Sequence, residues 1–509
     1  MSDSANHVWP IVIVAAVLTS FIVVGLMNKA REGSDYLFSG RYIGRIGGGA
    51  AIASNWMSAA SFLGMAGLLY LNGYAALAYV IGWTGGYVLL LVLMAGQIRR
   101  FGKYTAPDFV GERYASPSAR VISALISIAI SLIYTIAQFK GVGMLFSWLF
   151  KIDYSKGVLL GSAAVVSYVV VAGMLGIARN QQMQYFVVIV SFIVPLMYLA
   201  HNLGYFWILP QFGYGVAIQD LSREFSINFA APFANSSLFQ WIALCFTLMV
   251  GTAGLPHVLS RFYIVPNIRD ARWSVVWGLF FIALIYWSAP AYAVFARLME
   301  ARAGMPMPPE AARKMADIIV LKAAVMGGVP LWLVGVLAAG AACAAFFTSA
   351  SLLLNGAASF SHDIYFRSIN PRASENLKMA VAKGATLVLA ALVTVCALNP
   401  PGLIAEITAT AFALAGNTIF PAFLLGIWWG RANKYGVISG MLTGMTVTFA
   451  EPLFGSFIPK LAAIFPITSS ALCGAPLVIF VMVAVSLLTP PPPDSMRQFL
   501  AKEVHGHLD

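Results

Sequence analysis

The chain has 509 residues, of which 60% are hydrophobic and only 10% are charged, and its mean hydropathy is +0.82. A water-soluble surface needs far more charge than this, so the composition excludes a set of soluble domains. Apolar runs recur from the first ten residues to about residue 488, each near the ~20 residues that cross a hydrocarbon core. We therefore expect an all-α membrane protein with about 13 transmembrane helices.

The first apolar run, Trp9 to Asn28, has no basic region before it and no small-residue cleavage site after it. We interpret it as a retained membrane span and not as a signal peptide. The other predicted spans follow in chain order at 46–73, 76–97, 118–149, 158–178, 183–205, 236–259, 273–299, 329–360, 378–398, 402–429, 435–450 and 468–488.

The net charge of +12 is explained by membrane topology, because Lys and Arg gather on alternate loops. These residues follow the first, third, seventh, ninth and eleventh spans: Lys29, Arg31, Arg41 and Arg45; Arg99, Arg100, Lys103 and Arg113; Arg261, Arg269 and Arg272; Arg367 and Arg372; Arg431 and Lys434. The positive-inside rule predicts an N-terminus outside and a cytoplasmic C-terminus. Nucleic-acid binding is not expected, since these charges are dispersed beside the membrane.

The four cysteines lie in or beside predicted spans without the spacing of metal ligands, so we interpret them as small packing residues: Cys245, Cys343, Cys396 and Cys473. The sequence also contains no pairing of nucleophile and base that indicates an active site. We therefore expect neither an enzyme nor an organic cofactor.

Two spans are interrupted by small and polar residues. One contains the stretch 53–61, Ala-Ser-Asn-Trp-Met-Ser-Ala-Ala-Ser, and the other ends in 251–257, Gly-Thr-Ala-Gly-Leu-Pro-His. A bilayer tolerates a broken helix only where it lines a cavity or is buried in protein. The two interruptions are five spans apart, as in two inverted five-helix halves, and such paired breaks indicate a transporter site. Gly and Ser that serve only close helix packing are the alternative.

Several stretches, in order along the chain, resemble the solute:sodium symporter family and its cation/acetate permeases. They are Asp35 to Arg41, Trp56 to Gly64, Pro107 to Tyr114, Gly251 to His257 with Arg261-Phe262, Ser361 to Tyr365, and Pro421 to Arg431. The resemblance implies a LeuT-like 5+5 inverted repeat. It also implies three parts: a first helix and loop at 1–45, a ten-helix core at 46–430, and two helices with a short tail at 431–509.

The resemblance further implies a coupling sodium ion between the first broken helix and the span at 329–360. Its ligands are expected to be backbone oxygens of Ser54, Met57 and Ala344 and side chains at 347 and 348. Thr348 supplies a hydroxyl, but Phe347 stands where a serine is expected. A phenyl ring offers no oxygen to a hard cation, so this sodium site is predicted to be degenerate.

Further departures from the family concern charge. Asn55 and Gln181 stand where relatives often carry aspartate, and Lys140 places an ammonium where an aliphatic residue is usual. An ionisable group within a bilayer is a functional hypothesis by default. Lys140 could replace the missing cation, receive a substrate carboxylate or pair with Glu406, while snorkelling to the outer interface is the structural alternative.

Candidate substrate ligands surround the first break, because a small anion needs convergent donors. They are Asn55, Trp56, Ser58, Ser61, Gln138 and Lys140. Lys140, Glu406 and His257 are candidates for proton or charge coupling, although an interfacial carboxylate and a structural histidine are open alternatives for the last two.

The resulting prediction is a symporter in a bacterial inner membrane that moves a monocarboxylate such as acetate, propionate or pyruvate by alternating access. The coupling ion is Na⁺ or H⁺, and proton-coupled or sodium-independent transport of a related organic anion is one alternative. A transporter-like membrane sensor or accessory subunit is another. The expected partners are the substrate anion, the lipid bilayer and a small membrane subunit.

Overall fold

The computed structural model is all-helical and describes residues 7–27, 45–101, 105–233, 236–260, 268–304, 307–454 and 466–506. The helices in chain order are α1 Val8–Met27, α3 Arg45–Trp56, η1 Ala60–Gly64, α4 Met65–Asn72, η2 Gly73–Ala76, α5 Leu77–Leu93, α6 Ala95–Phe101, α7 Ala106–Arg113, α8 Pro117–Phe150, α9 Tyr154–Asn202, α10 Pro210–Phe225, α11 Leu238–Gly254, α12 Pro256–Leu259, α13 Ile268–Arg302, α14 Pro309–Ala316, α15 Ile319–Met326, α16 Leu331–Ala358, η4 Ser359–Ile369, α17 Glu375–Leu398, α18 Ile404–Asn417, α19 Ile419–Trp428, α20 Lys434–Thr448, α21 Ala450–Phe454, η5 Ile467–Ser469, α23 Ala471–Leu488, α24 Asp494–Phe499 and η6 Leu500–His505.

Within the described residues, ten helical stretches are long and apolar enough to cross a membrane. The predicted spans at 46–73 and 236–259 are broken, and the one at 435–450 corresponds to the 15-residue α20. Two other predicted spans form one long element, α9, whose backbone turns at Gly173 with φ 59° and ψ −174°. That the chain has about 13 membrane spans therefore stays a prediction.

The outer surface of the bundle is apolar, as expected of a helix in lipid. On α17, Val388, Leu392 and Val395 are 61%, 52% and 68% exposed, and their spacing places them on one helical face. In water such a face would be covered by another helix, whereas hydrocarbon solvates it. The chain is accordingly a multi-pass membrane protein.

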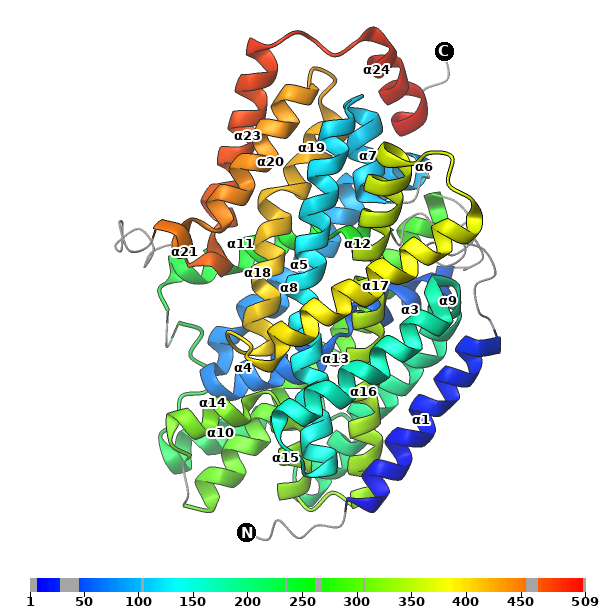
Figure 1. Cartoon of the computed structure of the whole chain (residues 1–509). Helices are drawn as coiled ribbons and strands as arrows, with labels where there is room; N and C mark the ends of the chain where they lie inside the picture. The colour runs from blue at the N-terminus through cyan, green and yellow to red at the C-terminus, as the bar shows by residue number, and fades with distance from the viewer. Residues whose placement is uncertain are drawn as a thin grey trace.

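The bundle has two distinct ends (Figure 1). The upper end in that view carries α6, α7 and α24 with the C-terminus, and the lower end carries α10, α14 and α15 with the N-terminus. Most long helices run between these ends. The names upper end and lower end are used below in this sense.

Small residues bring the helices close together. A Cβ on Gly86 of α5 would lie 2.2 Å from Cβ of Thr252 and 2.5 Å from the carbonyl oxygen of Met249, both on α11. These two helices form one of the most extensive pairs in the bundle. Glycine is therefore required at position 86 for a close approach, in the manner of small-residue contacts between membrane helices.

We expect Gly86→Ala to lower the free energy of unfolding by about 1–3 kcal/mol, because the methyl group overpacks the α5–α11 contact. Gly384 in α17 is the matched control, since its Cβ would meet no atom within 4 Å. Gly384→Ala should stabilise the helix by up to ~1 kcal/mol. Thermal unfolding followed by tryptophan fluorescence compares the two variants, and equal effects would contradict this packing.

Candidate functional site

The first predicted break is present between α3 and the π-helical turn η1. α3 ends at Trp56, and Met57 and Ser58 are not helical. The Ser58 hydroxyl accepts hydrogen bonds from the backbone N–H groups of Ala60 (3.1 Å) and Ser61 (3.4 Å). A serine in this role caps the start of the second helical segment and competes with continuous helix.

The second predicted break is present at Leu255. α11 ends at Gly254, Leu255 is extended with φ −68° and ψ 119°, and Pro256 begins the short helix α12. Proline has no N–H group and disfavours helical backbone at the residue before it, which explains the position of the break. A Cβ on Gly254 would lie 2.5 Å from the carbonyl oxygen of Ala415, so α18 packs directly against this point.

Tyr134 of α8 lies between the two breaks. Its hydroxyl donates to Ser58 Oγ (3.3 Å), and its ring meets the His257 ring edge to face, with 5.5 Å between centroids. Phe412 of α18 contacts both Tyr134 (5.8 Å) and Trp56 (5.6 Å). The space between the two breaks is thus occupied by aromatic side chains in this conformation.

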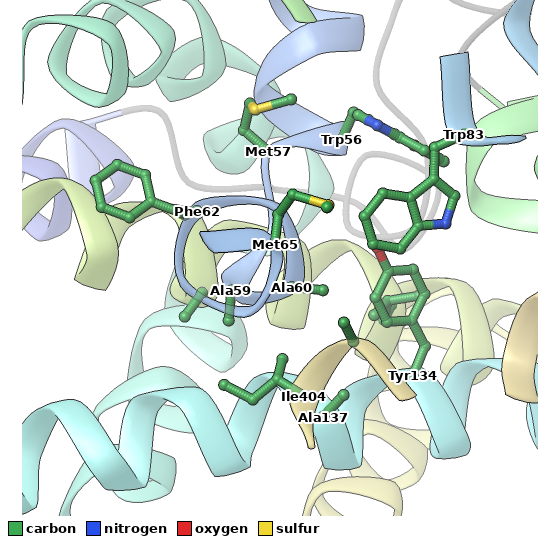
Figure 2. Close-up of a cluster of buried hydrophobic side chains, with 14 of the residues drawn as sticks. Trp56, Met57, Ala59, Ala60, Phe62, Met65, Trp83, Tyr134, Ala137 and Ile404 are labelled. Atoms are coloured by element: carbon green, nitrogen blue, oxygen red, sulfur yellow. The ribbon is translucent and has the colours of Figure 1, made fainter. Parts of the chain in front are cut away.

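Figure 2 shows this region, with Trp56 and Met57 at the end of α3 and with Tyr134 and Ala137 on α8. The side chains form one tightly packed cluster, in which Trp56 is 1% exposed. Any molecule that enters must displace or rotate these rings.

Gln138 is one turn beyond Tyr134 on the same face of α8. Its Oε1 accepts a hydrogen bond from the backbone N–H of Ala59 (2.8 Å) at the first break. Its Nε2 is buried and has no hydrogen-bond partner among the described residues, and the same is true of Trp83 Nε1. Buried donors are normally paired, so these two unpaired donors are candidates to bind an acceptor on a ligand.

Other predicted substrate ligands are already paired with protein groups. Trp56 Nε1 donates to the hydroxyl of Tyr286 (3.0 Å), and Ser61 Oγ lies 2.9 Å from that same hydroxyl. Asn55 is 2% exposed, and its carbonyl oxygen accepts a hydrogen bond from Thr348 Oγ1 (3.4 Å). The structure therefore brings five of the six candidates, all except Lys140, to the first break.

Two neighbouring residues of the predicted sodium site, Phe347 and Thr348, lie on different faces of α16. Thr348 faces the first break through its bond to Asn55, whereas the Phe347 ring packs edge to face against Phe21 (5.1 Å) and Tyr168 (5.4 Å). Phe347 also lines a small apolar crevice beside α1. Its ring points towards α1 and α9.

The remaining members of that set are buried near the same break. Met57 and Ala344 are 0% and 2% exposed, and Ser54 Oγ donates to Gln184 Oε1 (3.2 Å). The side chain of Gln181 lies outside the described residues. The sequence analysis did not single out Gln184 as a site residue. It could have been found as a polar side chain within a predicted membrane span.

Lys140 lies near the lower end and pairs with a residue that the sequence did not suggest. Its Nζ is 2.5 Å from Asp317 Oδ2 and donates to the carbonyl oxygen of Gly402 (2.8 Å). Asp317, between α14 and α15, also accepts from the backbone N–H of Ile404 (3.3 Å). Burial raises the pKa of Asp317 above its ordinary value, although Lys140 acts in the opposite direction.

Glu406 has a separate partner. Both of its carboxylate oxygens accept from Arg313 Nη2, at 3.0 and 2.8 Å, and Oε2 also accepts from the backbone N–H of Leu403 (2.9 Å). The suggested Lys140–Glu406 pair is thus replaced by two pairs, Lys140–Asp317 and Arg313–Glu406. Together they tie α14 and the start of α15 to α8 and α18 at the lower end.

A bundle of membrane-spanning helices with two broken helices near each other, and with buried donors beside one of them, is typical of a membrane transporter. The model of the sodium:solute symporter family matches residues 36–444. This match covers most of the chain, which therefore belongs to the sodium:solute symporter family.

Curated relatives cover nearly the full length. The chain is 28% identical to an uncharacterized symporter of Cupriavidus necator, over 95% of this chain and 92% of the relative. It is 31% identical to the uncharacterized symporter YwcA of Bacillus subtilis, over 84% and 82%. It is 27% identical to a protein of Corynebacterium glutamicum named monocarboxylic acid transporter, over 91% and 88%.

Solved structures show the same fold. A Na⁺-coupled sialic acid symporter in a substrate-bound outward-open state matches with a TM-score of 0.76 and 14% identity, over 95% of this chain and 99% of that one. Mhp1, a nucleobase-cation-symport-1 family transporter in a closed conformation, matches with a TM-score of 0.56, 13% identity and coverages of 92% and 97%. At these identities the likeness concerns the fold alone.

Proposed function

We propose that the protein is a secondary active symporter that moves a small monocarboxylate, such as acetate, propionate or pyruvate, by alternating access. The observation that carries this proposal is the pair of buried donors, Gln138 Nε2 and Trp83 Nε1, that have no hydrogen-bond partner among the described residues near the first break. The name of the Corynebacterium relative supports the same substrate class.

The chemistry of the site favours a small anion with an apolar body. A carboxylate offers acceptors only, and it would pair with the two donors that have no hydrogen-bond partner among the described residues. The neighbouring rings of Trp56, Phe412 and Tyr134 provide apolar contact for a short alkyl chain. Small-molecule sites are typically lined by apolar side chains with a few fixed polar groups, and the residues around the first break have this composition.

The proposal includes the predicted organisation of the chain. The first helix and loop at 1–45 precede a 5+5 inverted-repeat core at 46–430, and two helices with a tail follow at 431–509. In a bacterial inner membrane, with the N-terminus outside, the lower end of Figure 1 faces outwards and the upper end faces the cytoplasm.

Uptake of labelled acetate into proteoliposomes, with sodium and proton gradients imposed separately, tests this function. We expect one of the two gradients to drive accumulation above the external concentration. If neither gradient drives uptake of acetate, propionate or pyruvate, the proposal is wrong, and the result favours a membrane sensor or accessory subunit.

The role of α16 in cation coupling is tested by substitution at neighbouring positions. If the coupling ion is sodium, Thr348→Ala should weaken the sodium dependence of uptake about 10-fold or more, because it removes an oxygen that faces the first break. Phe347 packs against Phe21 and Tyr168 and points away from the first break, so Phe347→Ser should leave the sodium dependence unchanged. An unchanged sodium dependence in Thr348→Ala would contradict the assignment of this cation site.

A further inference from the structure

A cluster of ionisable side chains lies at the upper end, where α7 and the π-helical segment η4 meet. Asp108 of α7 and Asp363 of η4 are both fully buried. One oxygen of each lies within 4.8 Å of the other and of a ring nitrogen of His362. Neither carboxylate belongs to the central site around the two helix breaks.

Asp108 is surrounded by groups that favour its negative charge. His362 Nε2 donates to Asp108 Oδ2 (3.1 Å), and Nη2 atoms of Arg120 and Arg367 lie 3.8 and 3.9 Å from Oδ1. Burial alone would raise the pKa of Asp108, but these neighbours hold it below its ordinary value. Asp108 is therefore the ionised member of the pair.

Asp363 has much weaker support for a charge. Thr105 Oγ1 donates to its Oδ1 (2.9 Å), while Oδ2 is buried and makes no hydrogen bond within the described part of the chain. A second carboxylate charge on Asp363 would lie within 4.8 Å of the charge on Asp108 and would be repelled by it. A charge on Asp363 would also carry a desolvation cost, because its Oδ2 is buried without a hydrogen-bond partner among the described residues.

A bound ion could offset this repulsion, but the other charges of the cluster argue against a metal ion. The guanidinium groups of Arg120 and Arg367 already approach Asp108, and a divalent cation would be repelled by both. Glu112, 3.9 Å from Arg120, is a further charged group beside the cluster. A proton neutralises Asp363 without this repulsion.

We propose that Asp363 carries a proton in this conformation, so that Asp108 and Asp363 form a proton-binding site separate from the substrate site. The proton is held while α7 and η4 are in contact. Separation of these two elements would expose Asp363 to water and favour its ionisation. The ligand of the site is thus H⁺, and its occupancy is linked to closure of the upper end.

Infrared spectroscopy of the purified full-length protein tests this directly. The spectrum should contain a protonated carboxyl band that shifts in heavy water and is lost in Asp363→Asn. Because asparagine resembles a neutral acid, this variant should also unfold within a few degrees of the unsubstituted protein at neutral pH. Asp108→Asn should unfold at a clearly lower temperature, since it leaves the basic groups without their counter-charge.

Two results would overturn the proposal. An unchanged carboxyl band in Asp363→Asn would mean that Asp363 is ionised. A divalent metal that co-purifies in stoichiometric amount, and that is lost in the same variant, would mean that the cluster binds a metal ion instead. Neither readout depends on transport, so this test is independent of the proposed substrate.

Discussion

Lys140→Met is expected to lower the free energy of unfolding by about 3–5 kcal/mol, because it leaves the Asp317 carboxylate buried without its counter-charge. The side chains of Lys140 and Asp317 are only 12% and 2% exposed, and they join α8 to the segment between α14 and α15. Denaturant titration followed by tryptophan fluorescence measures the loss.

Two further variants show whether the lost charge pair is the cause. Lys140→Met combined with Asp317→Asn should recover most of the stability, since asparagine is neutral and still accepts from the backbone N–H of Ile404.

Arg313→Gln is the matched exposed control. The side chains of Arg313 and Glu406 are 57% and 32% exposed, so breaking their pair should cost at most ~1 kcal/mol. Equal losses in Lys140→Met and Arg313→Gln would contradict the account of the buried pair.

Gln138→Leu is expected to weaken acetate binding by about 10- to 100-fold. A hydrogen bond to a charged group contributes about 1.5–3 kcal/mol, and the variant removes the unpaired Nε2 donor. It also removes the acceptor of the Ala59 backbone N–H, so some of the effect will come from the helix break itself. Equilibrium binding of labelled acetate to the purified protein measures the change.

Gln138→Glu separates these two contributions. Glutamate keeps an oxygen for the N–H of Ala59, but its ionised form repels a carboxylate substrate. Binding should therefore be weak at neutral pH and should recover as the pH falls and the new side chain is protonated. If acetate binding is the same in both variants and in the unsubstituted protein, Gln138 does not contact the substrate.

Much of the helical architecture could be predicted from the sequence, because apolar length and helix-breaking residues act locally. The breaks at Ser58 and Leu255 follow from a serine that caps a helix and a proline that cannot continue one. The division of the chain into spans was less certain. The predicted spans at 158–178 and 183–205 belong to α9, where a single glycine, Gly173, turns the backbone.

The site could be predicted in part. Five of the proposed substrate ligands gather at the first break because four lie on the broken segment itself and Gln138 packs against it. The partner of Lys140 could not be predicted, because Asp317 is 177 residues away in the sequence, between two predicted spans, and only packing brings the two together. Trp83 and Tyr134 were not distinguished from ordinary core aromatics for the same reason.

The orientation of Phe347 illustrates the limit of reading a site from residue identity alone. The sequence shows that position 347 has no hydroxyl group. Which side chain reaches the break depends on how α16 is rotated about its axis, and the sequence does not show this. In the structure Thr348 faces Asn55 while Phe347 packs on Phe21 and Tyr168. A phenyl ring on that face does not fill the space beside the break.

The central claim is that the first break lies on a passage that opens alternately to the two sides of the membrane. Cysteine labelling tests it most directly, with Ser58→Cys in a protein whose four native cysteines are replaced. Ser58 is fully buried in this conformation. The account predicts that a membrane-impermeant maleimide reacts slowly with the new thiol from either side, and that acetate slows both reactions. A thiol that stays unreactive from both sides, with or without acetate, would contradict it.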